Sequence, residues 1–127
     1  MSDGFVPGRH AIDAYGAGGF RFAGMSHVGS ILATSGGVHA VAARDVLELR
    51  VESFGPLLAE LAANPGSTEL LVIGLGEKIA RLPAPLATRL RGAGLRLEVM
   101  ATGPAARIYN VLLGENRRVA ALLLAAP

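Results

Sequence analysis

The sequence predicts a single small α/β domain, in which a meander of strands precedes alternating helices and strands. Two observations lead to this prediction. Short apolar segments separated by glycine turns fill the first half, whereas the second half repeats a helix followed by a strand three times. Strands joined by helices pack parallel with right-handed crossovers, so the second half is expected to build a parallel sheet.

Chain length and composition fit one folded domain. The chain has 127 residues, of which 51% are hydrophobic and only 17% are charged, and this composition argues against disorder. We expect a flexible N-terminus over residues 1–11 and one domain over residues 12–127. Aromatic residues make up only 5% of the chain and tryptophan is absent, so the core is expected to be mainly aliphatic.

The meander is expected to consist of short strands joined by glycine turns. Alternating or apolar segments suggest extended chain at Ile12–Tyr15, Phe20–Phe22, His27–Thr34 and Val38–Ala42. Turns rich in glycine separate these segments at residues 16–19, 23–24 and 35–37.

The second half is expected to contain three helices and three strands. The periodicity predicts helices at about residues 54–63, 85–91 and 102–113, and strands at residues 70–74, 95–100 and 119–124. Glu52 or Ser53 is expected to cap the first helix, and Thr102 the third, with Pro104 in its first turn. The apolar run Leu70–Gly74 is typical of a strand that is buried on both faces.

Several classes of function are excluded or disfavoured by composition. The chain has no cysteine, which excludes disulfides, thiolate metal sites, Fe–S clusters and a cysteine nucleophile. His10, His27 and His39 show no metal-binding spacing, so neither a metal nor a cofactor is expected, and the last two are interpreted as surface or core-edge residues. The net charge is only +2 and basic residues are dispersed, so no nucleic acid is expected as a partner.

The same chain shows no targeting or membrane segment. Residues 1–9 lack the apolar core of a signal peptide, and no stretch approaches the roughly 20 apolar residues of a membrane span. These features lead us to expect a cytoplasmic protein.

A candidate ligand site lies where two neighbouring parallel strands are expected to end. Gly74 and Gly76 follow the buried strand, and glycines there let a phosphate approach backbone amides. The helix that begins at Thr102 offers free N–H groups, and Arg107 and Asn110 on that helix could reach a ligand. The alternative is structural: the glycines turn the chain, Thr102 caps the helix, and Arg107 is solvated.

The remaining polar clusters have simpler explanations. Glu115 with Arg117 and Arg118 could form a site, but adjacent opposite charges more often form a solvated salt bridge. Asp45, Glu48 and Glu52 have helical spacing and are interpreted as an exposed face. No nucleophile elbow or pair of catalytic carboxylates is recognisable, which argues modestly against an enzyme.

An ordered series of short motifs nevertheless resembles one family along residues 12–124. The series consists of Tyr15-Gly16, Gly19-Phe20-x-Phe22, Gly29-Ser30-Ile31-Leu32, Leu70 to Gly76, Gly94 to Val99, and Thr102 with Ala105, Ala106, Tyr109, Asn110, Leu112, Glu115 and Arg117. It resembles the domain-of-unknown-function family of Mth938-like proteins, which includes the mitochondrial complex I assembly factor 3.

The resemblance implies a fold and a kind of function. It implies a three-layer α/β fold with a mixed sheet, helices packed on that sheet and an N-terminal β-meander. It also implies a non-catalytic interaction or assembly factor for a respiratory-type membrane complex, with membrane-complex subunits as partners. The alternative is a small-anion or nucleotide-binding protein, or an enzyme, that uses the crevice at the carboxyl ends of the parallel strands. The oligomeric state stays open.

This chain departs from the family pattern at four positions. Leu75 and Ile108 stand where threonine is frequent, Ala101 where aspartate is frequent, and Val41 where tryptophan is frequent. Three of these departures remove polar groups near the expected crevice, which favours a structural role for the crevice in this chain.

Overall fold

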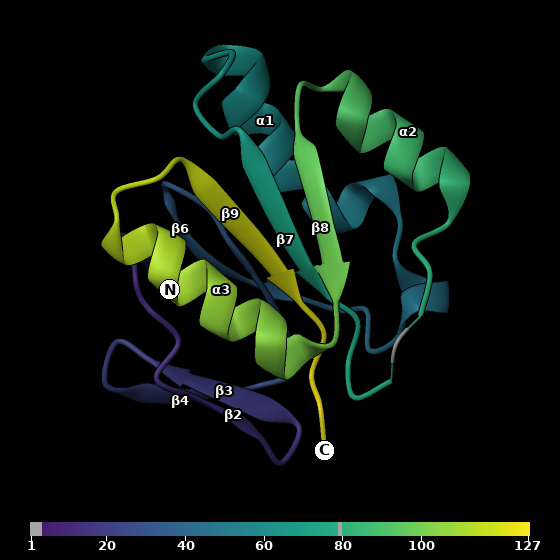
Figure 1. The fold of residues 1–127 in the computed structure, drawn as a ribbon. Coiled ribbons are helices and arrows are strands. Elements are labelled where there is room, and N and C mark those ends of the chain that lie inside the picture. Colours follow the sequence, from purple (N-terminus) through teal and green to yellow (C-terminus); the bar gives the residue numbers. More distant parts are fainter. Residues whose placement is uncertain (1–3, 79) are drawn as a thin grey trace.

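The computed structural model describes residues 4–78 and 80–127 and has three layers (Figure 1). A six-stranded mixed sheet forms the middle layer. Helices α1 (Gly55–Ala63) and α2 (Ala84–Gly92) cover one face, and helix α3 (Thr102–Gly114) covers the other beside a three-stranded sheet. This is the three-layer α/β architecture that the family resemblance implied.

The central sheet joins an antiparallel half to a parallel half. Its strands, in spatial order, are β1 (Phe5–Pro7), β6 (Gly37–Val41), β5 (Ser30–Ala33), β9 (Val119–Leu123), β7 (Leu70–Gly74) and β8 (Arg96–Met100). Strand β7 pairs parallel with both β8 and β9, as expected for strands connected by helices. Strand β9 also pairs antiparallel with β5, so it connects the two halves.

The small sheet consists of β2 (Ala14–Gly16), β3 (Gly19–Phe22) and β4 (Met25–Val28). A single strand was predicted from the sequence over residues 27–34, and this prediction is wrong. Gly29 has a φ of 101°, which breaks the extended chain because side-chain-bearing residues rarely adopt that conformation. The two parts of the expected strand, β4 and β5, therefore belong to different sheets.

Residues 5–7 form an edge strand, although the sequence analysis assigned them to a flexible N-terminus. Strand β1 pairs antiparallel with β6, and the ring of Phe5 packs against the imidazole of His39 with centroids 4.6 Å apart. Gly37 makes room for this strand, because a Cβ at that position would collide with the Val6 carbonyl oxygen and the Phe5 ring. Residues 1–3 lie outside the described residues.

Helix α1 starts differently from the prediction. Two 3₁₀ turns, Val46–Glu48 and Val51–Phe54, precede it, and no side chain of the described residues caps its N-terminus. The Ser53 hydroxyl instead accepts the Arg50 N–H at 3.1 Å and closes the second turn. Neither Glu52 nor Ser53 is therefore the cap of α1.

Two hydrophobic clusters lie on opposite faces of the central sheet. Leu71 and Ile73 of β7 face the cluster under α1 and α2, whereas Val72 faces the cluster under α3 and the small sheet. All three side chains are fully buried, so β7 is covered on both faces as its apolar run predicted. Within the described chain, no helix combines the length and apolar character needed to cross a membrane.

Candidate functional site

The carboxyl end of β7 and the start of α3 meet where the sequence analysis placed its crevice. The Gly76 N–H donates to the Thr102 hydroxyl oxygen at 2.8 Å, and the Thr102 N–H donates to the Gly76 carbonyl at 2.8 Å. The Thr102 hydroxyl in turn donates to the carbonyl of Leu124 at 2.7 Å. These groups hydrogen-bond one another, so they are not directed at a ligand in this arrangement.

Thr102 is not the cap of α3. Ala101 occupies the position before the helix, and no side chain in the described part of the chain caps the helix N-terminus. Thr102 is the first helical residue and is fully buried. Its hydroxyl links three segments: the loop after β7, the start of α3 and the chain after β9. The partner carbonyl lies 22 residues further along the chain, so local sequence patterns could not indicate it.

Gly74 permits close packing of α3 on the sheet. A Cβ at this position would lie 2.8 Å from the Thr102 Cα and 3.0 Å from the Ala105 Cβ and the Leu123 Cδ2. Gly76 has a φ of 89°, a left-handed conformation that favours glycine. Both glycines thus have structural reasons for their identity that need no bound phosphate.

The first turn of α3 is also covered from outside. Gly103 is buried, and a Cβ there would collide with the ring and hydroxyl of Tyr15 from strand β2. The half-exposed Tyr15 side chain therefore packs directly on the helix terminus. A ligand approaching the N–H groups of this turn would have to displace it.

Asn110 and Arg107 have different surroundings on α3. The Asn110 side chain accepts the Ile12 N–H and donates to the Ile12 carbonyl, both at 2.8 Å, so it pairs with the backbone as a neighbouring strand would. This pair attaches the segment before β2 to the helix. Arg107 is exposed and forms no ion pair among the described residues. The structure does not bring the two side chains to one ligand.

Arg117 pairs with Glu69 rather than with Glu115. The carboxylate of Glu69 lies 3.4 Å from an Arg117 nitrogen and 2.8 Å from an Arg118 nitrogen. The hydrogen bond and the charge of Arg118 are the main causes that lower the pKa of Glu69 below its ordinary value. Because Glu69 precedes β7, this cluster lies at the opposite end of that strand from Gly74. The predicted site residues therefore do not form one site.

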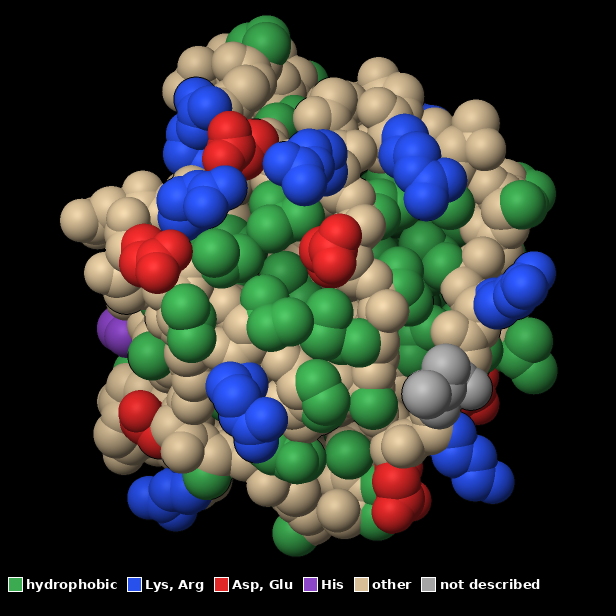
Figure 2. Space-filling model, viewed as in Figure 1, with side chains coloured by type: hydrophobic (Ala, Val, Ile, Leu, Met, Phe, Trp, Pro, Cys, Tyr) green, Lys and Arg blue, Asp and Glu red, His purple; other side chains and the backbone are tan. Residues whose placement is uncertain are grey.

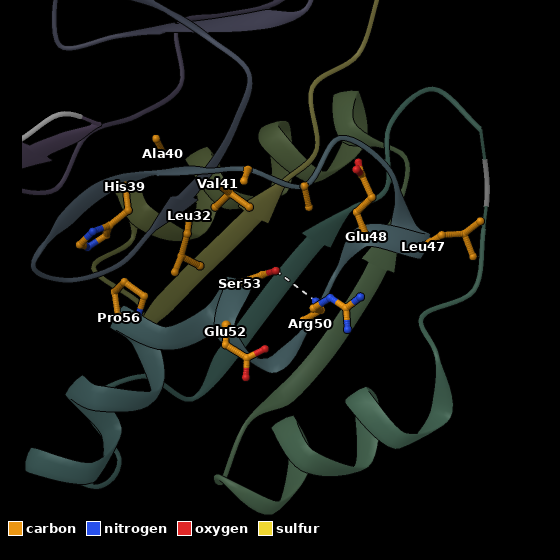
Figure 3. Close-up of a pocket in the computed structure, with 12 residues that line it drawn as sticks. Leu32, His39, Ala40, Val41, Leu47, Glu48, Arg50, Glu52, Ser53 and Pro56 are labelled. Carbon is orange, nitrogen blue, oxygen red and sulfur yellow. Dashed lines mark hydrogen bonds between the residues drawn. The ribbon is translucent and has the colours of Figure 1, made fainter.

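A hollow of about 490 Å³ lies elsewhere, beside β6 and the two 3₁₀ turns (Figure 3). Its lining consists of Leu32, His39, Ala40, Val41, Ala42, Ala43, Leu47, Glu48, Arg50, Glu52, Ser53 and Pro56. Figure 3 shows His39 and Pro56 at one end and Leu47 and Glu48 at the other. The helical spacing of Glu48 and Glu52 predicted one exposed helical face, but the two residues lie in separate 3₁₀ turns. The hollow could not be predicted from the sequence, because separate turns give no periodic pattern.

The hollow combines apolar walls with the charged side chains of Glu48, Arg50 and Glu52. Burial lowers the pKa of the His39 imidazole below its ordinary value, and the Glu60 carboxylate partly opposes this effect. Burial therefore favours the neutral form of the imidazole, which can both donate and accept a hydrogen bond. Within residues 4–78 and 80–127, no group of three or more His, Asp or Glu side chains is placed to hold a metal ion.

Comparison with known proteins places the chain in a family. Residues 12–124 match the family described as "Protein of unknown function (DUF498/DUF598)". An uncharacterized protein of Rhodobacter capsulatus is 45% identical over 116 residues, which cover 91% of this chain and 85% of that protein.

Solved structures show the same fold. The crystal structure of a protein described as an outer membrane protein from Bartonella henselae matches with a TM-score of 0.87 and 42% identity, over 95% of this chain and 98% of that chain. A Bordetella pertussis protein described as a Mth938-like domain matches with a TM-score of 0.78 and 23% identity, over 91% and 85% of the two chains. The chain belongs to the DUF498/DUF598 family of proteins of unknown function and has the Mth938-like fold.

Proposed function

We propose that this protein acts without catalysis, as an interaction or assembly factor for a respiratory-type membrane complex. The observation that carries the proposal is the outer side of α3, where Arg107, Ile108 and Val111 form what we call the α3 surface. The side chains of Ile108 and Val111 are 37% and 54% exposed, and their spacing of three residues makes them neighbours on the helix. Figure 2 shows hydrophobic side chains gathered across this side of the molecule, with charges among them.

The chemistry of the α3 surface suits a protein partner. Covering aliphatic side chains stabilises a complex by about 25 cal/mol per Å² of apolar area removed from water. Arg107 adds a cation that can pair with a partner carboxylate and fix the orientation of the complex. The proposed partner surface is therefore apolar with at least one acidic side chain.

The family resemblance supports this choice. The chain resembles the family of the mitochondrial complex I assembly factor 3, from which the proposed kind of partner is taken. Asn110, which the sequence analysis placed beside Arg107, is engaged with Ile12 and is therefore left out of the proposed surface.

The test is recovery of partners by the tagged protein at its native expression level, with mild crosslinking and mass spectrometry. The informative variant carries Ile108→Glu and Val111→Glu, which place charges in the α3 surface. The matched control is Leu47→Glu, because Leu47 is 86% exposed in a 3₁₀ turn on the α1 and α2 side of the sheet.

We expect to recover membrane-complex subunits with the wild type and with the Leu47 control. The double variant should recover at least about tenfold less of these subunits. Equal recovery from all three proteins would show that the α3 surface is not the contact. Recovery of the wild-type protein alone would contradict the proposed function itself.

A further inference from the structure

The two edges of the central sheet differ in how open they are to another strand. Strand β1 has three residues and ends in Pro7, which has no N–H to donate. Strand β8 has five residues, Arg96–Met100, and contains no proline. Because edge strands present unpaired backbone groups, β8 is the better template for pairing with a further strand.

The pairing of β8 with β7 fixes which backbone groups point outward. The Arg96 N–H donates to the Glu69 carbonyl at 2.9 Å, and the Met100 carbonyl accepts the Leu75 N–H at 2.8 Å. Alternate residues of a parallel strand face its neighbour, so the backbone of Arg96 and Met100 faces β7. The N–H and carbonyl groups of Leu97 and Val99 therefore point toward the free edge.

The side chains of β8 add a pattern of charge. Arg96 and Glu98 are exposed and lie on one face of the strand, since they are two residues apart. Neither forms an ion pair within the part of the chain that the structure describes. Leu97 is half-buried and Val99 is 38% exposed, so apolar surface accompanies the free backbone groups.

We propose that β8 pairs antiparallel with β8 of a second copy of this chain, with Leu97 opposite Leu97 on a twofold axis. In this register the two Leu97 residues exchange a pair of backbone hydrogen bonds, because their N–H and carbonyl groups point outward. Leu95 then lies opposite Val99, and each Arg96 lies opposite the Glu98 of the other copy. The two central sheets become one continuous sheet.

Charge selects this register over its neighbours. Moving the axis by one residue in either direction would place Glu98 opposite Glu98 or Arg96 opposite Arg96, and like charges directly opposite destabilise a strand pair. In the proposed register each of the two charged pairs joins an arginine to a glutamate. They occupy the non-hydrogen-bonded positions, where the Cα atoms of opposing residues approach to about 4.5 Å. The twofold axis makes the Arg96–Glu98 contact occur twice.

The first test measures the mass in solution by light scattering and sedimentation. We expect the wild type to be a dimer, and Arg96→Glu to raise the dimer dissociation constant by about tenfold or more, because both ion pairs become repulsive. The double variant Arg96→Glu with Glu98→Arg restores both pairs with reversed sign and should restore the dimer. Circular dichroism checks that each variant is folded. A monomeric wild type, or a double variant as weak as the single one, would overturn the proposal.

The second test uses the absence of cysteine from the chain. Leu97→Cys places one thiol on the proposed twofold axis, and Leu47→Cys places one outside β8, on the exposed 3₁₀ turn Val46–Glu48. A short bismaleimide should link two copies of the Leu97 variant rapidly and those of the Leu47 variant slowly. Equal rates would contradict the register. Both tests use the purified chain alone, so their outcome is independent of the partner proposed for the α3 surface.

Discussion

Replacing Thr102 with valine removes one hydroxyl from the point where three segments meet and nearly preserves side-chain volume. The change leaves the buried Leu124 carbonyl without a donor and the partly buried Gly76 N–H without an acceptor. A buried backbone group that loses its partner costs about 1–3 kcal/mol, and a partly buried one less. We therefore expect the free energy of unfolding to fall by about 2–4 kcal/mol.

Urea denaturation followed by circular dichroism measures this loss. The midpoint should fall while the slope with denaturant stays unchanged, because the surface exposed on unfolding is the same. At about 3–5 °C per kcal/mol for a domain of this size, the melting temperature should fall by roughly 6–20 °C.

Two companion variants make the result specific. Thr88→Val changes an exposed threonine on α2 and should alter the free energy of unfolding by less than about 0.5 kcal/mol. Thr102→Ser keeps the hydroxyl and loses a methyl group, so it should cost about 1 kcal/mol. A Thr102→Val variant as stable as the wild type would show that the hydroxyl does not link these segments.

Four further predictions follow from the described contacts. Gly74→Ala forces a Cβ against the backbone of α3 and should destabilise the fold by about 1–3 kcal/mol in urea denaturation, whereas Gly92→Ala, with open space around its Cα, should be neutral or stabilising. Asn110→Ala should cost about 1–3 kcal/mol, and hydrogen exchange at the Ile12 amide should accelerate, whereas unchanged protection there would contradict the pairing. The imidazole of His39 should titrate below pH 6.5 by NMR, and titration at or above pH 6.5 would contradict the lowered pKa. Because the pKa is lower in the folded state, the contribution of His39 to stability is present above the unfolded pKa and is lost as pH falls through the folded pKa. Phosphate and nucleotides should leave the melting temperature unchanged, since the amides of the expected crevice are engaged internally, whereas a clear rise would favour the anion-binding alternative.

The parallel half of the fold could be predicted because its signals are local. The apolar run of β7 and the periodicity of its flanking helices lie within short stretches of sequence, and the strand bounds Leu70–Gly74 agree with the prediction. The division at Gly29 was missed because an apolar segment can continue on either side of a glycine without revealing a change of sheet. Phe5–Pro7 was missed because so short a strand has no periodicity.

The candidate site was predicted less well because its contacts join distant residues. Asn110 pairs with Ile12 across 98 positions, and Arg117 pairs with Glu69 across 48. Single-sequence reasoning relates residues within one element or between adjacent elements, so it placed Asn110 beside Arg107 and Arg117 beside Glu115. The structural interpretation of Gly74 and Gly76, which the sequence analysis kept open, agrees with the contacts of both glycines.

The position of β9 has a consequence for how the protein is made. Ribosomes synthesise the strands of both halves of the central sheet before β9, yet β9 lies between β5 and β7 and is the strand that joins those halves. Until Val119–Leu123 emerges, the nascent chain holds two incomplete sheets, each with an uncovered inner edge open to aggregation. Biogenesis of this fold thus depends on a late segment, and chaperones that shield strand edges would act before that segment arrives.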